Sequence, residues 1–161
     1  MTKITTQPLT SLAFATFGNV LELKDSPDKL INQGLCGRHH DLADMAFTEG
    51  RAGLSLFNAQ PRALPYRLDM VERHPDGSQA FIPLNPAPFL VIVAADIEGK
   101  PDAPKAFLSK PFQGINFYKN TWHGVLTPLS APGLFAVVDR IGPGDNLEEF
   151  WFDTPYTIVS T

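Results

Sequence analysis

Proline and glycine are spread along the whole of this 161-residue chain, with 15 prolines, 12 glycines and no stretch in which they pool. Both residues interrupt regular structure, so they divide the chain into segments that are too short for long helices. These segments are apolar or alternate apolar with polar residues, which is typical of β-strands. We therefore expect a mainly β fold, a β-barrel or sandwich with a few short helices, in one domain over residues 1–161.

The expected strands lie between these interruptions. They span Gly18–Leu23, Gly53–Asn58, Tyr66–Arg73, Gln79–Leu84, Phe89–Ala95, Ala106–Leu108, Gly114–Tyr118, Leu134–Arg140 and Phe150–Phe152, with short helices at Thr10–Phe17 and around Leu42–Glu49. Two segments, FLVIVAA and LFAVVDR, are apolar on both faces, so each of these strands must be covered on two sides. This pattern favours a homodimer, in which a second copy covers part of the apolar surface.

Charge and composition limit the partners of the chain. The net charge is -4 and the basic residues are scattered singly, which argues against a nucleic acid or an anionic membrane surface as a partner. No segment is long and apolar enough to span a membrane, and we see no signal-peptide pattern. The single cysteine, Cys36, cannot form an internal disulfide. We expect a cytoplasmic protein whose ligand is a small molecule.

The segment DMVERHPDGSQAFIPL carries the most informative polar residues. Glu72 and His74 are two residues apart, so on a strand they point to the same side. Gln79 can return to the same place after a Pro-Asp-Gly turn. This Glu-x-His-x4-Gln spacing is similar to the first metal motif of cupin barrels, His-x-His-x4-Glu. The second cupin motif adds a histidine from a later strand, and His123 falls where that histidine is expected.

Three interpretations of this set remain open on the residues alone. Glu72, His74, Gln79 and His123 could hold a divalent metal ion, although an amide oxygen is a weaker ligand than a carboxylate. The same residues could form a metal-free acid–base site, with Glu72 as the base and a histidine as the acid. Alternatively they are structural, with Glu72 paired to a neighbouring arginine and His74 a buried barrel histidine.

Other polar residues extend the candidate site. The glycine-containing segment INQGLCGRHHDLA holds Arg38 and His40, and adjacent histidines point in different directions, so at most one of them faces a site. Asn116 and Tyr118 alternate with apolar residues, and we expect their polar face to look into a wet cavity. Arg140 can bind a substrate carboxylate with both arms of its guanidinium only if it lies on the cavity side of its strand.

Several of these segments together resemble one family. ERHPDGSQAFIPL, QGINFYKNTWHGVLTPL, VVDRIGPGDNLEE, FGNV and INQGLCGRHHDLA resemble, in order and spacing, the ureidoglycolate lyase family, and the likeness runs from Phe14 to Glu149. The resemblance implies a cupin-like β-barrel homodimer that acts late in allantoin and purine breakdown. It also implies cleavage of (S)-ureidoglycolate to glyoxylate and urea, in relatives whose activity is associated with a divalent ion such as nickel.

The chain departs from the family pattern within its second motif. Where members are expected to read Asn-Tyr-His and Trp-His-His, this chain reads Asn116-Phe117-Tyr118 and Trp122-His123-Gly124. Two histidines are therefore missing, and His123 is the one that remains. A metal ion is consequently less firmly implied here than in relatives that keep all three.

The chemistry that the resemblance implies can be assigned to residues as a hypothesis. Ureidoglycolate carries a hydroxyl, a carboxylate and a urea nitrogen on one carbon, so its cleavage requires a base and an acid but no nucleophile. We expect Glu72 or His74 as the base and His123 as the acid. The expected substrate-binding residues are Arg38, His40, Gln79, Asn116, Tyr118 and Arg140. Two alternatives are an amidohydrolase that releases ammonia and a non-catalytic module that binds a small carboxylate.

Overall fold

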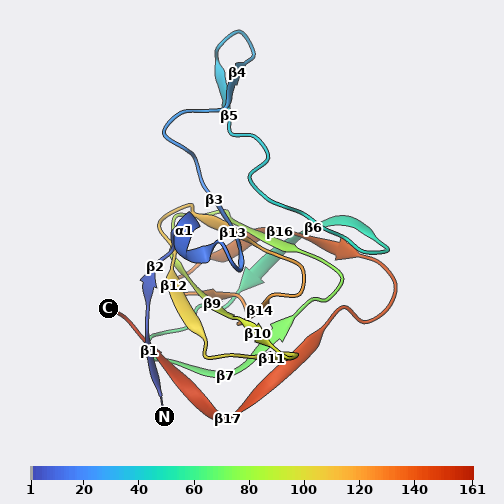
Figure 1. Ribbon diagram of the computed structural model, residues 1–161. Helices are drawn as coiled ribbons and strands as arrows, with labels where there is room; N and C mark the ends of the chain where they lie inside the picture. Colours follow the sequence, from blue (N-terminus) through green and yellow to red (C-terminus); the bar gives the residue numbers. More distant parts are fainter. Residues whose placement is uncertain (1) are drawn as a thin grey trace.

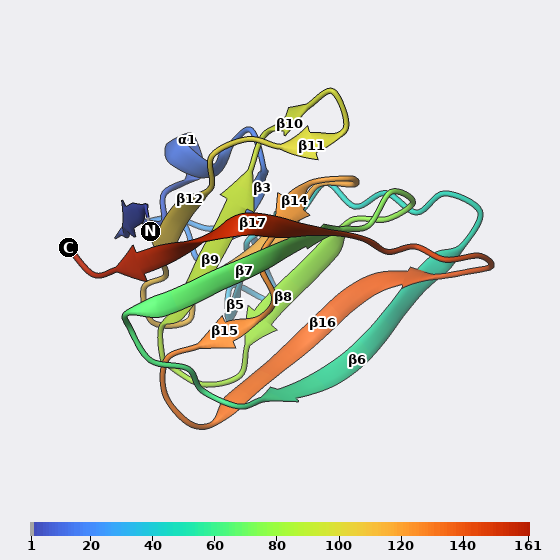
Figure 2. The same ribbon diagram turned by 90° about the horizontal axis from the view of Figure 1, so that it is seen from below.

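The computed structural model describes residues 2–161, and nearly all of its regular structure is β (Figures 1 and 2). Among these residues the only helix is α1 (Ser11–Phe14), where the Thr10 side chain caps the start by accepting a hydrogen bond from the Ala13 amide at 3.2 Å. That helix is too short to cross a membrane, and the described chain has no other candidate. The prediction of a mainly β, cupin-like fold is confirmed.

An eight-stranded sheet forms the larger layer. Its order is β1 (Lys3–Thr5), β17 (Glu148–Val159), β7 (Tyr66–Arg73), β14 (Trp122–His123), β9 (Phe89–Ala94), β12 (Lys105–Leu108) and β2 (Gln7–Pro8), with β15 (Thr127–Pro128) beside β9. The sheet curls so far that β1 comes back into contact with β12. This curl nearly closes the sheet into a barrel.

A five-stranded sheet packs against the first. Its order is β3 (Gly18–Leu21), β13 (Gly114–Phe117), β8 (Gln79–Pro83), β16 (Gly133–Ile141) and β6 (Arg51–Ala59). Two hairpins lie outside both sheets, β4 (Lys29–Ile31) with β5 (Cys36–Arg38), and β10 (Asp96–Ile97) with β11 (Lys100–Pro101). The β4–β5 hairpin projects away from the body of the molecule (Figure 1).

Two hydrophobic clusters lie on opposite faces of the eight-stranded sheet, and β9 contributes to both. Phe89, Val91 and Val93 join the cluster between the two sheets, whereas Leu90, Ile92 and Ala94 join the cluster inside the curl. The FLVIVAA segment is thus covered on both sides within one chain, so it is no argument for a dimer. On β16, by contrast, the outward side chains of LFAVVDR are only half-buried.

The expected helix around Leu42–Glu49 is wrong. These residues are irregular, because side chains in or next to the five-stranded sheet accept hydrogen bonds from their backbone amides. The Asn19 side chain accepts from the Asp44 amide at 2.9 Å, and the Ser78 side chain, just before β8, accepts from the Ala46 amide at 2.9 Å. The strands that sequence reasoning missed are mostly two or three residues long. The last strand, β17, is much longer than the expected Phe150–Phe152, since it continues through a register shift between Trp151 and Tyr156.

Candidate active site

Two adjacent strands of the eight-stranded sheet bring Glu72, His74 and His123 together. His123 on β14 pairs directly with Glu72 on β7, and His74 follows β7 immediately. The three side chains each offer one ligand atom, and these atoms lie within 4.8 Å of one another. The backbone amide of Asn120 donates to the His74 carbonyl at 2.9 Å and ties the two segments. This grouping is as predicted from the spacing of the residues.

Backbone carbonyls orient both imidazole rings. The Nδ1 atom of His74 lies 2.7 Å from the carbonyl oxygen of Asn146, and that of His123 lies 3.0 Å from the carbonyl oxygen of Gly124. A carbonyl can only accept, so each Nδ1 carries the hydrogen, and in a neutral ring Nε2 then presents a lone pair. Both Nε2 atoms are buried and have no hydrogen-bond partner among the described residues. The two histidines therefore direct acceptors toward the same space.

Burial controls the protonation of this cluster. The pKa of His123 is lowered to about 3, chiefly by burial and also by the nearby charge of His74, while its bond to the Gly124 carbonyl opposes the shift. Burial raises the pKa of Glu72, with His74 opposing and Glu149 reinforcing that shift. His123 is thus neutral at pH 7 and has no proton on Nε2. This argues against the expected role of His123 as the acid.

Gln79 joins the cluster from the five-stranded sheet. It lies on β8 opposite Phe117, whose ring stacks on His123 with centroids 4.2 Å apart and planes 7° apart. Its Nε2 donates to a carboxylate oxygen of Asp139 on β16 at 3.2 Å, and its Oε1 is buried without a partner among the described residues. Asp139 was not among the expected site residues. Its position became clear only once β16 was placed in register with β8.

On the polar face of β13, Asn116 does not look into a cavity, whereas Tyr118 just after the strand lines an open groove of about 300 Å³. Ile115 and Phe117 point into the cluster between the sheets, so Asn116 and Tyr118 lie on the outer face. There Asn116 donates to the Asn19 side chain and the Asp44 carbonyl, each at 3.1 Å, and the Tyr118 hydroxyl accepts from Asn19 at 3.2 Å. The alternation was recognised correctly, but the apolar side chains occupy the interior because burying them is favourable.

The expected carboxylate-binding residues also lie apart from the cluster. Arg38 and His40 are exposed, on β5 of the projecting hairpin and just after it. Arg140 donates through Nε to the Thr48 carbonyl and through Nη2 to the carbonyls of Glu49 and Pro143. These bonds leave only Nη1 of Arg140 free, so the arginine cannot grip a carboxylate with two parallel bonds. Within one chain, Arg140 connects the loop at Thr48 and Glu49 to the loop at Pro143.

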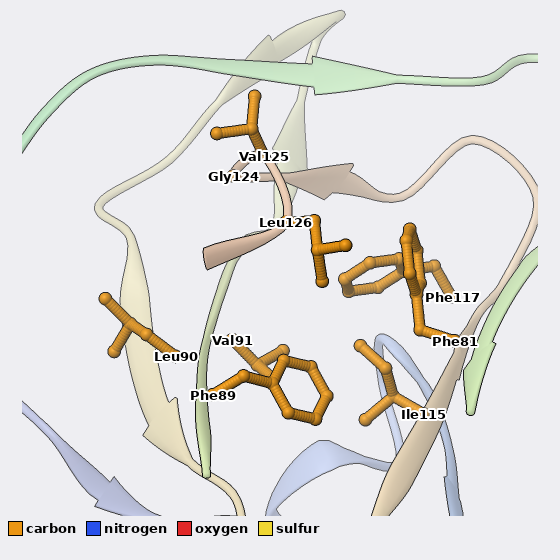
Figure 3. A pocket seen from close by; sticks show the side chains of 9 residues that line it. All are labelled: Phe81, Phe89, Leu90, Val91, Ile115, Phe117, Gly124, Val125 and Leu126. Carbon is orange, nitrogen blue, oxygen red and sulfur yellow. The ribbon is translucent and has the colours of Figure 1, made fainter. Parts of the chain in front are cut away.

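The space beside the Phe117 ring is almost filled by apolar side chains. Figure 3 shows Phe81, Phe117 and Leu126 pointing toward one another around a cavity of about 10 Å³. A single water molecule needs roughly 10–15 Å³, and its site must also be polar. The packed core beside Phe117 therefore offers no room for a substrate, which must reach the cluster by another route.

An open groove reaches Glu72 from the solvent. It has a volume of about 330 Å³ and is also lined by Arg62, Arg67, Met70 and Glu149. Arg67 is paired with a carboxylate, that of Asp69, whereas Arg62 donates to the Tyr66 hydroxyl at 2.9 Å and forms no ion pair among the described residues. Arg62 is thus an unneutralised cation near the cluster. Sequence reasoning missed it, since nothing distinguishes a single arginine in a proline-containing loop.

The curled sheet, the packed interior and the cluster contributed by β7, β14 and β8 define a cupin-like protein with an interior polar site. The model of the family described as ureidoglycolate lyase matches residues 1–159. Three relatives are named ureidoglycolate lyase: that of Rhodobacter capsulatus is 57% identical over 98% of this chain and 99% of its own length, that of Chelativorans sp. 51% over 98% and 97%, and that of Agrobacterium fabrum 50% over 95% and 93%. The chain belongs to the ureidoglycolate lyase family.

Proposed function

We propose that this protein cleaves ureidoglycolate to glyoxylate and urea; its relatives carry the name ureidoglycolate lyase. The observation that carries the proposal is the cluster of Glu72, His74 and His123, in which lone pairs converge within 4.8 Å at the end of an open groove. A site made of acceptors suits a substrate that must lose a hydroxyl proton.

Glu72 is the base in this proposal. Its pKa is raised by burial, which makes the carboxylate a stronger proton acceptor than an exposed one. The carboxylate takes the hydroxyl proton as the carbon–nitrogen bond breaks and the new carbonyl of glyoxylate forms. The protonated Glu72 then returns that proton to the departing urea nitrogen. Atoms and charge balance, because one proton moves from oxygen to nitrogen and no nucleophile adds to the substrate.

His74 and His123 hold the reacting end of the substrate in place. Their Nε2 lone pairs can accept hydrogen bonds from its hydroxyl or urea N–H groups. The substrate carboxylate needs a cation to bind it. Within one chain, Arg62 is the best candidate, because it lines the same groove as Glu72 and has no carboxylate partner among the described residues. This assignment replaces Arg140, whose Nε and Nη2 donors are occupied.

The cluster also fits a divalent metal ion such as nickel. Two buried imidazole Nε2 atoms without partners and a carboxylate are the donor types that such ions prefer, with the Gln79 oxygen as a weaker fourth ligand. When bound, the ion would stabilise negative charge on the substrate oxygen. The four ligands would be Glu72, His74, Gln79 and His123.

A product assay on freshly prepared ureidoglycolate tests the proposal. Glyoxylate, urea and ammonia are followed together, above the rate of uncatalysed decay, with untreated, chelator-treated and nickel-reloaded protein. Urea equal to glyoxylate, without ammonia, is the expected result. Ammonia release would indicate an amidohydrolase, and no acceleration would indicate a module that only binds a small carboxylate. A loss of activity on chelation that nickel restores would assign the metal to the site.

We further propose that residues 1–161 act as a single domain, in the cytoplasm, and as a homodimer. The outer face of the five-stranded sheet supports the dimer: Leu54 and Leu56 of the edge strand β6 are 72% and 75% exposed, and Ile82 on β8 is 43% exposed on the other side of β16. The β4–β5 hairpin, which is isolated in one chain, could reach a second copy and carry Arg38 and His40 with it. Sedimentation equilibrium of wild type and of Leu56→Glu tests this association: dimer for the first, monomer for the second.

A further inference from the structure

We propose that Asp139 is a positioning residue, which orients the Gln79 side chain so that its carbonyl oxygen receives an N–H group from the urea half of the substrate. The identity of that ligand rests on the proposed function. The sequence spacing that predicted the cluster identifies neither Asp139 nor this role.

The pairing of β8 with β16 places the two residues side by side. Ala80 pairs with Val138, so the preceding Gln79 and the following Asp139 are neighbours on the inward face of the sheet. Gln79 donates from Nε2 to a carboxylate oxygen of Asp139 at 3.2 Å. Gln79 is 7% exposed, so water does not readily compete for this bond.

This hydrogen bond determines which end of the Gln79 amide faces Asp139 and which end is left without a partner. An ionised carboxylate can only accept, so the NH₂ group of Gln79 must face Asp139 and Oε1 must point away from it. Oε1 is buried and has no hydrogen-bond partner among the described residues. Leaving a buried acceptor unpaired is unfavourable, which is expected where the missing donor comes from a ligand.

The neighbouring groups show what that ligand must bring. The Nε2 atoms of His74 and His123 are also buried acceptors without partners among the described residues. A carboxylate has acceptors only, and the substrate hydroxyl gives its one hydrogen to Glu72, whereas a urea group carries several N–H donors. The Gln79 end of the site therefore suits the urea half of the substrate and not the glyoxylate half. Without Asp139 the amide could rotate and present its NH₂ group instead.

The first test compares two substitutions at position 139. Asp139→Leu removes the acceptor, and we expect kcat/KM for ureidoglycolate to fall at least tenfold. Asp139→Asn keeps an oxygen that can accept from Gln79, and we expect it to stay within threefold of wild type. The control is Asp145→Leu, which makes the same change at an exposed position in the loop after β16 and should have no effect.

Binding of two stable probes gives a readout that simple loss of structure would not change selectively. N-carbamoylglycine keeps the urea group and the carboxylate but lacks the hydroxyl, and glyoxylate lacks the urea group. In Asp139→Leu the affinity for N-carbamoylglycine should fall at least tenfold, while that for glyoxylate should stay within twofold. Equal weakening of both probes would overturn the proposal.

An exchange of the two residues tests the hydrogen bond itself. Gln79→Glu alone places two carboxylates against each other and should be strongly impaired. Adding Asp139→Asn restores a donor–acceptor pair with the original total charge, and a glutamate oxygen again faces the site. We expect the double variant to recover at least tenfold in kcat/KM over Gln79→Glu alone. This comparison remains informative if Asp139→Leu fails to fold.

Several outcomes would refute the role of Asp139 while leaving the proposed function intact. Three of them are kinetic: an Asp139→Leu enzyme with normal kcat/KM, an Asp139→Asn enzyme as impaired as Asp139→Leu, or no recovery in the double variant. The fourth concerns the metal: Asp139→Leu loses bound nickel, while the metal-free variant binds N-carbamoylglycine with unchanged affinity. The proposed function fails separately, when wild-type protein forms no urea and glyoxylate from ureidoglycolate.

Discussion

Replacing Glu72 by glutamine should reduce activity and increase stability at the same time. Glutamine has nearly the same shape, so Glu72→Gln removes the charge and the basicity without creating a cavity. Loss of a positioned general base lowers the rate by about 10²–10⁴-fold. At about 1.4 kcal/mol for each factor of ten, this range corresponds to about 3–5 kcal/mol of lost transition-state stabilisation.

The stability effect has the opposite sign because burial raises the pKa of Glu72 above its ordinary value of 4.5. A carboxylate with a raised pKa in the folded state favours folding below its unfolded pKa, and this contribution is lost as pH rises through the folded pKa. At pH 7 the ionised Glu72 therefore destabilises the metal-free protein. Glu72→Gln should unfold at higher guanidinium concentration than wild type at pH 7, and the difference should shrink toward pH 4.

The assay measures kcat/KM for urea formation and chemical unfolding of metal-free protein on the same samples. Glu149→Gln is the matched control, since Glu149 pairs with Glu72 across strands β17 and β7 but is exposed. It should stay within a few fold of wild type and shift the acidic limb of the pH–rate profile to lower pH, because its charge helps to raise the pKa of Glu72. Near-normal turnover by Glu72→Gln, or destabilisation at pH 7, would refute this reasoning.

Three further changes test the packing and the ligands of the site. Phe117→Ala removes the ring stacked on His123 and should cost about 3–5 kcal/mol of unfolding free energy in guanidinium titrations; a loss below 1 kcal/mol would show that the core does not depend on it. Asp96→Ala leaves the buried Trp122 indole N–H without its 2.8 Å acceptor and should cost about 1–3 kcal/mol. Because the Trp122 hydrogen bond lowers the pKa of Asp96, that loss should be full above pH 4 and shrink as pH falls further, and a pH-independent loss would contradict it. His74→Ala should abolish nickel retention in equilibrium dialysis while wild type retains it, and equal retention would exclude His74 as a ligand.

The sequence alone was sufficient for most of the longer strands and for the pairing of Glu72 with His74 in the site. Alternation and the flanking turns predicted β7 with its observed bounds, Tyr66–Arg73. The period of two along a strand placed Glu72 and His74 on the same side, and the structure brings them together. These features are local, since they depend only on backbone geometry and on residues close in the chain.

Face and register were decided by the tertiary structure. The alternation in β13 predicts two faces, but only the packing of Phe117 against the other sheet makes Asn116 point outward, under the segment that was expected to be a helix. In β16 the sequence places Asp139 and Arg140 on opposite faces. Pairing with β8 decides that Asp139 meets Gln79 and that Arg140 binds loop carbonyls.

The chain by itself thus determined a mainly β protein of the ureidoglycolate lyase family, with a carboxylate and a histidine side by side on one strand. Only the tertiary structure decided the protonation, the orientation and the neighbours of those groups. His123 is neutral because the fold buries it. The side-chain oxygen of Gln79 points away from Asp139 because that carboxylate, on a strand distant in the sequence, accepts a hydrogen bond from the amide nitrogen. Burial and contacts between distant strands depend on the whole packing, which no local pattern of residues contains.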